Sequence, residues 1–420
     1  MTALTLEVLA SAVAGDVAAF RAISRLQPAG GPGDKVFPST YAVSNGVKYA
    51  IEQRRIDGQS VKTVLLDSVA SQANRLELAL RDAWERGEIT LPIISVDFST
   101  FEDLADLGRI TVLDAPHRIA DAIFRDSELD GTAFRMSTVG RAFTEATSKA
   151  ATPVFVYCPS ALVFGVWDST GPKGGLGAKY ARALSSEIVG IGAEVGVKTG
   201  SRIDPLAISK HVEVYAQADD NAEWTANAEL AQKDRKGNPV AHGGKGDTRP
   251  STVNHGNVAP SIDSDAGGVT IDYALQTTVL SLPALRRLRF PRAADGTALS
   301  GAQRLKAENA AHTALAALGI AAMVFARRDG YDLRSRCALV AESPFTLEAV
   351  PSDGSAPTSY SLDTAGAAKL LQDASAAARA AGMGWHDDEI RLAPATRLVD
   401  LVRRSREKHI ELAAAEGEAE

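Results

Sequence analysis

Residues 49–68 read YAIEQRRIDGQSVKTVLLDS and carry the clearest fold signal in the chain. Two β-prone runs, residues 49–56 and 61–67, flank the turn formers Asp57 and Gly58, a pattern typical of a β-hairpin. Ser68 is a favourable N-cap, and apolar residues recur after it at helical spacing. The stretch therefore predicts a hairpin whose second strand leads directly into a helix, as part of a core sheet.

Strands and helices alternate through the rest of the chain without a strict period, which predicts an α+β fold. No internal repeat of about 20 to 50 residues is present. The dipeptide Asp329-Gly330 predicts a second hairpin, in which residues 320–328 pair with residues 331–340. Further helices are predicted at residues 4–25, 116–126, 300–318, 364–381 and 396–415, and further strands at 89–96, 154–167 and 269–282.

The composition is that of a folded soluble protein, because 45% of its 420 residues are hydrophobic and 23% are charged. No run of ~18 uninterrupted apolar residues occurs, and the first 26 residues lack a signal-peptide pattern. Neither a membrane span nor secretion is therefore expected. Cys158 and Cys337 lie far apart in apolar runs, which predicts buried thiols in a reducing compartment, the cytoplasm.

The net charge of −7 argues against a protein that coats nucleic acid with its whole surface. Acidic residues gather in the tail, residues 407–420, whereas basic residues form separate clusters elsewhere. Any site for a polyanion must therefore be local.

A glycine-rich loop, residues 171–179 (GPKGGLGAK), follows a predicted strand and is expected to open a helix. Its backbone amides would form a nest for phosphate at that helix N-terminus. The loop fails the triphosphate-binding and dinucleotide-binding patterns, because Ala178 and Tyr180 stand at required positions. A purely structural tight turn is the alternative. The candidate phosphate contacts are Lys173, Gly174, Gly175, Lys179 and Arg182.

Polar side chains on the hairpin, on the helix after Ser68 and on the glycine- and proline-rich loop at residues 27–35 suit contacts to phosphates and sugars. The alternative is an ordinary solvated surface. Adjacent residues of a strand point to opposite faces, so at most one of the two hairpin arginines would face a given groove. The candidate contacts are Lys35, Arg54, Arg55, Gln72, Asn74 and Arg75.

Residues 219–268 are rich in Gly, Asn, Asp, Lys and Pro, which predicts an inserted arm. Asp219, Asp220, Asp263 and Asp265 would hold magnesium in a nuclease, but acids beside a polar loop are more often solvating or capping residues. His242 and His255 lack a third ligand at zinc-like spacing, so no metal site is expected. The candidate nucleic-acid contacts of the arm are Lys245, Arg249, Asn254, His255 and Asn257.

The densest positive charge in the chain lies at residues 285–292 (LRRLRFPR), after a predicted strand. Such density is costly without an anion nearby, so Arg286, Arg287 and Arg289 are further candidate contacts, with Arg292 beside them. The seven histidines are scattered, and no Ser-His-Asp or Cys-His arrangement can be singled out. No catalytic residue and no cofactor is therefore predicted.

Together, four motifs resemble the backbone subunit of type I-G (formerly I-U) CRISPR surveillance complexes, in the Cas-seven group of the RAMP superfamily. The motifs span residues 67–75, 171–179 with 186–188, 254–257 and 281–287, and the resemblance covers roughly residues 27–340. It implies a modified ferredoxin-like, RNA-recognition-motif (RRM-like) palm over residues 1–420, with inserted finger and thumb segments. Residues 219–268 are then the candidate thumb or finger, and residues 385–420 a helical tail.

The resemblance also implies a non-catalytic function in antiviral defence. Several copies would polymerise as a filament along the spacer of a CRISPR RNA (crRNA), bind its backbone and leave bases free to pair with target DNA. Further partners would be the large subunit, the crRNA-end-binding subunit and a recruited helicase-nuclease, with no membrane. The aromatic strand signature of a standard RNA-recognition motif is missing, which fits a scaffold that contacts sugar and phosphate rather than bases.

Two other functions remain open from the sequence. Related type III backbone subunits cut target RNA with an acidic loop residue, so a metal-dependent ribonuclease that cuts complementary RNA is one alternative. A purely structural self-assembling protein, in which basic clusters meet acidic patches of the next copy, is the other.

Overall fold

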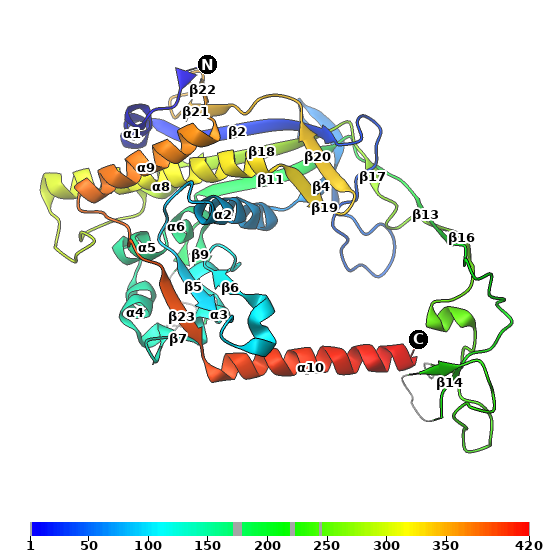
Figure 1. The fold of residues 1–420 in the computed structure, drawn as a ribbon. Coiled ribbons are helices and arrows are strands. Elements are labelled where there is room, and N and C mark those ends of the chain that lie inside the picture. Colours follow the sequence, from blue (N-terminus) through cyan, green and yellow to red (C-terminus); the bar gives the residue numbers. More distant parts are fainter. Residues whose placement is uncertain (1, 171–178, 219–222, 243–245, 420) are drawn as a thin grey trace. The chain divides into compact units, whose positions relative to one another are not determined.

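The computed structural model describes residues 2–170, 179–218, 223–242 and 246–419 (Figure 1). The chain divides into two compact units. The core unit contains Met1–Ala42, Tyr49–Glu194 and Val269–Leu398, and the second unit contains Val43–Lys48, Val195–Gly268 and Val399–Glu420. The fold is mixed α+β, as the alternation of strand and helix patterns predicts.

A mixed sheet in the order β1-β22-β21-β2-β18-β11-β4-β3 forms the centre of the core unit, and β20 also pairs with β2. Its middle is antiparallel: β2 runs against β18, and β18 runs against β11. The strands are β1 (Thr2–Ala3), β2 (Val17–Pro28), β3 (Ile51–Ile56), β4 (Gln59–Asp67), β11 (Leu184–Ile191), β18 (Tyr273–Ser281), β19 (Tyr331–Arg334), β20 (Cys337–Ala341), β21 (Leu347–Pro351) and β22 (Thr358–Ser361).

Helices cover one face of this sheet (Figure 1). The longest, α8 (Gly301–Asp329), packs against α1 (Leu6–Ala14), α2 (Val69–Glu85) and α9 (Thr364–Ala380). Burial alternates along β2, where Phe20, Ala22 and Leu26 are buried and Ile23 is exposed, as expected for a sheet covered on one face. By length and composition α8 is apolar enough to cross a membrane, but 83% of its apolar window is buried inside the protein, which is typical of a core helix.

The hairpin and helix predicted at residues 49–87 are confirmed. Strands β3 and β4 pair in antiparallel register from Ile51↔Val64 to Ile56↔Gln59. Asp57 and Gly58 both have positive φ, 49° and 80°, which matches the right-handed twist of a two-residue turn. The Ser68 hydroxyl accepts a hydrogen bond from the Ser71 amide at 3.3 Å and caps α2.

Three other element predictions are wrong. Residues 320–328 continue α8 and form no strand. The prediction failed because residues 311–325 are all buried, so this part of the helix shows no helical periodicity of apolar residues. Residues 154–167 form helices α5 (Thr152–Tyr157) and α6 (Ser160–Phe164), separated at Pro159, and the strand β9 (Val166–Trp167). The helix predicted at residues 4–25 ends at Ala14, where the Gly15 amide donates to the Ser11 carbonyl, and β2 follows.

A smaller sheet in the order β6-β5-β23-β7-β8 lies in the same unit. Its strands are β5 (Ile94–Asp97), β6 (Arg109–Thr111), β7 (Ser127–Leu129), β8 (Thr132–Ala133) and β23 (Ile390–Pro394). The short helices η2 (Arg118–Ala120), α3 (Ala122–Arg125) and α4 (Thr138–Glu145) accompany it. The single helix predicted at 116–126 is therefore broken, and Asp121 caps its second part.

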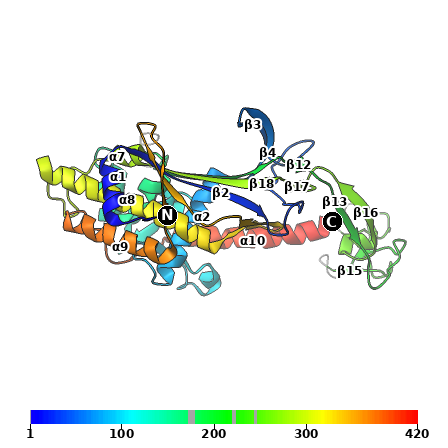
Figure 2. The same cartoon turned by 90° about the horizontal axis from the view of Figure 1, so that it is seen from above.

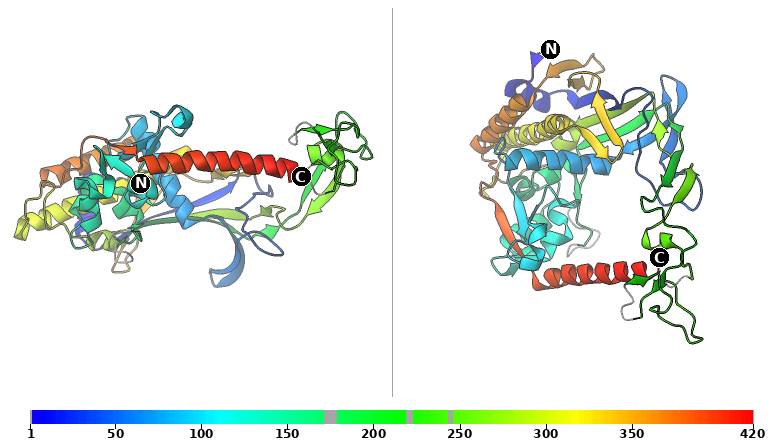
Figure 3. Two further views of the ribbon diagram at one scale, coloured as in Figure 1. Left: turned by 90° about the horizontal axis from the view of Figure 1, so that it is seen from below. Right: turned by 45° about the vertical axis from the view of Figure 1, so that its right-hand side comes forward.

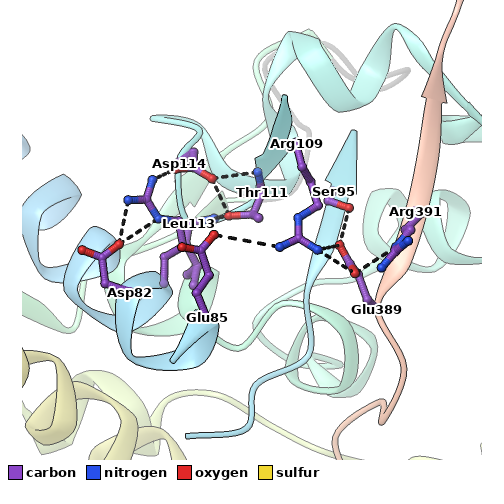
Figure 4. A network of polar contacts seen from close by, with 10 residues as sticks. Asp82, Glu85, Ser95, Arg109, Thr111, Leu113, Asp114, Glu389 and Arg391 are labelled. Carbon is purple, nitrogen blue, oxygen red and sulfur yellow. Dashed lines mark hydrogen bonds and ion pairs between the residues drawn. The ribbon is translucent and has the colours of Figure 1, made fainter. Parts of the chain in front are cut away.

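A network of polar contacts joins this sheet to the end of α2 (Figure 4). Glu389 accepts a hydrogen bond from the Ser95 hydroxyl at 2.7 Å and pairs with Arg109 and Arg391 at 3.2 and 2.9 Å. Arg109 also approaches Glu85 of α2 at 3.9 Å. Each of these charges meets an opposite charge within the protein, so the network holds strands together and leaves no free anion or cation here.

The second unit holds small antiparallel pairs and a helix. Strands β13 (Lys198–Arg202) and β16 (Val258–Asp263) run side by side (Figure 2), and β14 (Tyr215–Ala216) pairs with β15 (Trp224–Thr225). The predicted arm at residues 219–268 lies within the segment Val195–Gly268 of this unit. The predicted terminal helix is present as α10 (Thr396–Ala419), one unbroken helix in Figure 3.

Candidate nucleic-acid interface

A cavity of about 740 Å³ lies in the core unit beside the glycine-rich loop. It falls within the range of ~300 to 1,000 Å³ that is usual for small-ligand sites. Segments far apart in sequence meet in its wall, from the first turns of α2 to residue 182. Its polar and aromatic lining includes Asn74, His117, Arg118, Arg125, Trp167, Asp168, Lys179, Tyr180 and Arg182.

Two short strands frame the glycine-rich loop at this cavity. Strand β9 pairs with β10 (Lys179–Tyr180), with Lys179 opposite Trp167 and Tyr180 opposite Val166. Chain direction changes at Gly165, whose φ is +81° and where a Cβ atom would approach the Arg182 backbone to 3.0 Å. Glycine is therefore required at position 165 for the two strands to meet.

The helix expected after the glycine-rich loop is absent, because Lys179 begins the strand β10 and residues 181–183 that follow it are not helical. The predicted helix N-terminus is therefore wrong, whereas the predicted phosphate nest falls on residues 171–178, which lie outside the described residues. Lys173, Gly174 and Gly175 lie outside the described residues. Lys179 and Arg182, which flank the loop, both line the cavity.

Lys179 and Trp167 form the exposed wall of the cavity. The Lys179 ammonium lies 5.1 Å from the centre of the Trp167 ring, and Trp167 is 53% exposed. A cation beside an accessible aromatic face suits a nucleotide, since the cation attracts phosphate and the ring stacks on a base. Asn74 is half-buried in the same wall, and its side chain makes no hydrogen bond with any residue that the structure describes.

Arg182 and Arg118 form the deeper, fixed part of the wall. Arg182 donates to the carbonyl oxygens of Phe164 and Val69 at 3.0 and 3.2 Å. Burial, with the nearby charge of Arg118, lowers the pKa of Arg182 below its ordinary value, although the guanidinium remains a cation. Arg182 therefore contributes positive charge while it holds the start of α2 against the end of α6.

Arg118 forms a buried ion pair with Glu77 of α2, in which the Arg118 Nε donates to the Glu77 carboxylate at 2.7 Å. Arg118 also donates to the Gly165 carbonyl oxygen at 2.8 Å. Burial raises the pKa of Glu77 to about 7, against the opposing attraction of Arg118. The pair fixes the loop at residue 118, where φ is +53°, against α2.

The other predicted contacts on α2 are used inside the protein. Gln72 is buried and donates to Asp67 at 2.6 Å, while its carbonyl oxygen accepts from Ser186 and Gln276, each at 2.9 Å. Arg75 pairs with Asp67 at 3.0 Å and donates to the Leu333 carbonyl oxygen. These groups join α2 to β4, β11 and β18 across the covered face of the sheet.

The hairpin and loop cations also have internal partners. Arg54 pairs with Glu187 on β11 at 2.6 Å, and Arg55 donates to the Gly58 carbonyl oxygen at 2.7 Å. Lys35 is half-buried and already takes part in an interaction. None of these three lines the cavity.

The arginine-rich segment at residues 286–292 is largely structural. Arg286, at the end of α7 (Leu282–Arg286), donates to the carbonyl oxygens of Ala12, Val13 and Val17 at 2.7 to 2.9 Å. Arg289 pairs with Glu308 of α8 at 3.3 Å, and Arg292 donates to a backbone carbonyl. Arg287 is exposed, and its side chain has no partner among the described residues.

The described residues among the predicted contacts of the arm belong to the second unit. Arg249 pairs with Asp247, Asn257 accepts a hydrogen bond from the Asp204 amide at 2.7 Å, and the His255 ring lies 6.0 Å from that of Trp224. Asn254 is exposed in the left-handed conformation with φ of 58°, and Lys245 lies outside the described residues.

The acids of the arm show capping contacts where they are described. Asp263 accepts from the amides of Asp265 and Ala266 and pairs with Lys198 at 3.0 Å, and these contacts lower its pKa to about 2. Asp219 and Asp220 lie outside the described residues. Within the part of the chain that the structure describes, no three His, Cys, Asp or Glu side chains gather as a metal site.

Sequence reasoning missed most of the cavity lining. Trp167, Asp168, Tyr180 and Arg118 were not predicted as site residues, because they come from elements whose packing the sequence does not reveal. One signal was available: Trp167 is one of four tryptophans and lies four residues before the glycine-rich loop. An aromatic residue beside a basic, glycine-rich loop is typical of sites that bind single-stranded nucleic acid.

Residues 21–195 match the family model described as CRISPR-associated protein GSU0053. The matched segment begins within β2, ends four residues after β11 and contains every residue that lines the cavity. No curated protein matches the chain. The family match indicates a CRISPR-associated protein. In general terms, such a protein has CRISPR RNA and other Cas proteins as its partners.

Proposed function

We propose that this chain is the non-catalytic backbone subunit of a type I-G CRISPR surveillance complex and that it binds the sugar-phosphate backbone of crRNA. The family match over residues 21–195 carries the proposal, because it places the cavity within a CRISPR-associated segment. Bound copies would line the spacer, hold it at regular intervals and leave the intervening bases free to pair with target DNA.

The strand order supports an RRM-like palm. In chain order, β2 is followed by α2, β11, β18, α8 and then β20 and β21. Across the sheet these strands take the order β21, β2, β18, β11. This is the fourth-first-third-second order of a ferredoxin-like β-α-β-β-α-β unit, in which β3 and β4 are an added hairpin. The segment Val195–Gly268 is then the inserted thumb or finger between β11 and β18.

The cavity supplies the chemistry that such a palm requires. Lys179 and Arg182 provide positive charge for phosphate, and Trp167 offers an aromatic face that does not discriminate between bases. The net charge of −7 keeps the rest of the surface from attracting nucleic acid without selection. A local cationic site on an acidic protein suits a scaffold that accepts any spacer sequence.

The further partners follow from this proposal. Copies of the chain would bind along one crRNA as a filament in the cytoplasm, together with the large subunit and the crRNA-end-binding subunit. DNA cutting would belong to a helicase-nuclease recruited to the assembled complex, so the backbone subunit itself needs no metal or other cofactor.

The test is to express the affinity-tagged chain with a CRISPR array, purify it and sequence the RNA that accompanies it. We expect spacer-containing RNA of defined length. The double variant Trp167→Ala, Lys179→Ala should recover several-fold less of this RNA. The matched control is Lys306→Ala, which removes an exposed lysine of α8 outside the cavity. Recovery of no RNA, or of cellular RNA without spacer enrichment, would contradict the proposal.

A further inference from the structure

Two buried polar atoms in the cavity wall lack a hydrogen-bond partner among the described residues. One is Oδ2 of Asp168, and the other is the hydroxyl of Tyr180. Both residues line the cavity, and they are 1% and 4% exposed. Buried polar groups nearly always have hydrogen-bond partners. Two such atoms without a partner, on residues that line one cavity, indicate a ligand that supplies the missing partners.

Asp168 is held in place by its other oxygen. Arg135 donates to Oδ1 of Asp168 at 2.7 Å and to the Thr170 carbonyl oxygen at 2.6 Å. Oδ2 is the second oxygen of this ion-paired carboxylate, and a carboxylate can only accept hydrogen bonds. The ligand group that meets Oδ2 must therefore be a donor, and a phosphate oxygen does not qualify.

Tyr180 offers the complementary group. Burial raises the pKa of the Tyr180 phenol above its ordinary value, so its hydroxyl stays protonated and is free both to donate and to accept. Lys179 lines the same cavity, so its charge is available to the phosphate of a sugar held near this hydroxyl. Tyr180 can therefore donate and Asp168 can accept, and both residues line the same cavity.

A nucleotide has two kinds of donor. The amino and imino groups of the bases differ from base to base, whereas the ribose 2′-hydroxyl is present in every ribonucleotide. A scaffold that accepts any spacer requires the donor that does not vary. This step rests on the proposed function, and it selects the sugar over the base as the group that meets Asp168.

We propose that the cavity binds one ribonucleotide, whose 2′-hydroxyl donates to Oδ2 of Asp168 and contacts the Tyr180 hydroxyl, while Trp167 and Lys179 take its base and phosphate. The cavity is then the place where the chain distinguishes RNA from DNA. This contact does not involve the base, so the chain can distinguish RNA from DNA and still accept any base sequence.

The experiment measures binding of single-stranded eight-nucleotide probes to the purified, RNA-free, full-length chain. The probes are oligo-uridine, the same oligomer with 2′-fluoro sugars, and the ribo and 2′-fluoro forms of oligo-adenosine. A 2′-fluoro group lacks the donated hydrogen but is similar in size to a hydroxyl. We expect the ribo form to bind about ten-fold more tightly than the 2′-fluoro form with either base, as a hydrogen bond to a charged group implies.

Asp168→Asn hardly changes the shape of the side chain and should bring the ratio of ribo to 2′-fluoro binding affinity close to one. Because this change also weakens the pair with Arg135, Tyr180→Phe is a second variant that leaves that pair intact, and it should reduce the ratio too. Lys306→Ala is the control and should keep the wild-type ratio. Unfolding curves of each variant should match that of the wild type, which would show that a loss of the affinity difference comes from binding and not from misfolding.

The possible outcomes separate this inference from the proposed function. Tight binding of ribo and 2′-fluoro probes alike by the wild type would overturn the ribose contact and leave the scaffold proposal standing. A preference for adenosine over uridine, with no effect of the sugar, would instead assign a base amino group to Asp168 and overturn the inference. Failure to bind any probe would overturn both proposals.

Discussion

Two basic regions of the core unit, the cavity with Lys179 and Arg182 and the segment at residues 286–292, differ in what their charges contact. In the cavity, Lys179 faces an exposed aromatic ring beside orphaned polar atoms. In the segment, Arg286 caps the end of α1 and Arg289 pairs with Glu308. Three of the four arginines in this denser cluster are bound to partners inside the protein, so charge density in the sequence does not by itself identify an anion site.

The charges of the two regions also differ in whether they stabilise the fold or are available to a ligand. Arg286 satisfies backbone carbonyls at a helix end, which otherwise have no intrahelical partners, so its charge stabilises the fold. Lys179 makes no ion pair within the described residues, so its charge is available to a ligand. Substitutions should therefore affect stability in the segment and binding at the cavity.

The largest expected effect concerns His312, which holds the arginine-rich segment to α8. Its Nε2 donates to the Leu288 carbonyl oxygen at 3.0 Å, and burial lowers its pKa from 6.5 to about 4. Between these pH values the unfolded chain binds a proton that the folded chain does not, so stability falls as the pH falls. We expect a loss of about 3 kcal/mol from about pH 6.5 to about pH 4.

The variant His312→Gln keeps a side-chain donor and removes this titration. Urea unfolding at pH 7 and at pH 4.5 should show a smaller loss of stability in the variant than in the wild type. Parallel stability curves for the two proteins would show that His312 does not couple the segment to the core.

The second effect is expected at Arg286. Arg286→Ala leaves three carbonyl oxygens without their donor and should lower the free energy of unfolding by about 2 kcal/mol at neutral pH, as measured by urea denaturation. Arg287→Ala is the matched control, because the neighbouring side chain is exposed and unpaired among the described residues, and it should change stability by less than ~0.5 kcal/mol. Equal losses at both positions would remove the distinction between the two arginines.

The smallest expected effect is on the salt dependence of RNA binding. Each phosphate of a single strand that a cation neutralises contributes about −0.7 to the slope of log affinity against log salt concentration. Lys179→Ala should therefore make that slope shallower by about 0.7, and Arg286→Ala should leave it unchanged. A shallower slope for Arg286→Ala with no change for Lys179→Ala would move the RNA site to the arginine-rich segment.

The sequence predicted correctly those elements that are determined by a few neighbouring residues. The β3–β4 turn follows from Asp57 and Gly58, and the start of α2 follows from Ser68. Residues 320–328 could not be recognised as helix by the same rules, because a helix buried on all sides loses its polar face and its period. The Asp329-Gly330 pair marks the end of α8, and there it only resembles a hairpin turn.

The candidate site was predictable only where the sequence clusters coincide with the cavity. Asn74, Lys179 and Arg182 line it, and all three were predicted. Gln72 and Arg75 lie on the same helix but face the buried carboxylate of Asp67, which their own positions could not reveal. Arg118 reaches the cavity from a distant segment through its pair with Glu77, so only tertiary packing identifies it.

The hydrogen bonds among Gln72, Ser186 and Gln276 have a consequence for how this sequence can vary. Each of the three comes from a different element, and each satisfies a polar group that would otherwise be orphaned beneath the sheet. A change to an apolar residue at one position leaves its partners without a hydrogen bond, and a joint change of all three would also remove a partner from Asp67, Thr278 and Tyr331. The network thus extends from α2 through β11 and β18 to Asp67, Thr278 and Tyr331, so an apolar substitution at any one of the three positions is expected to lower stability.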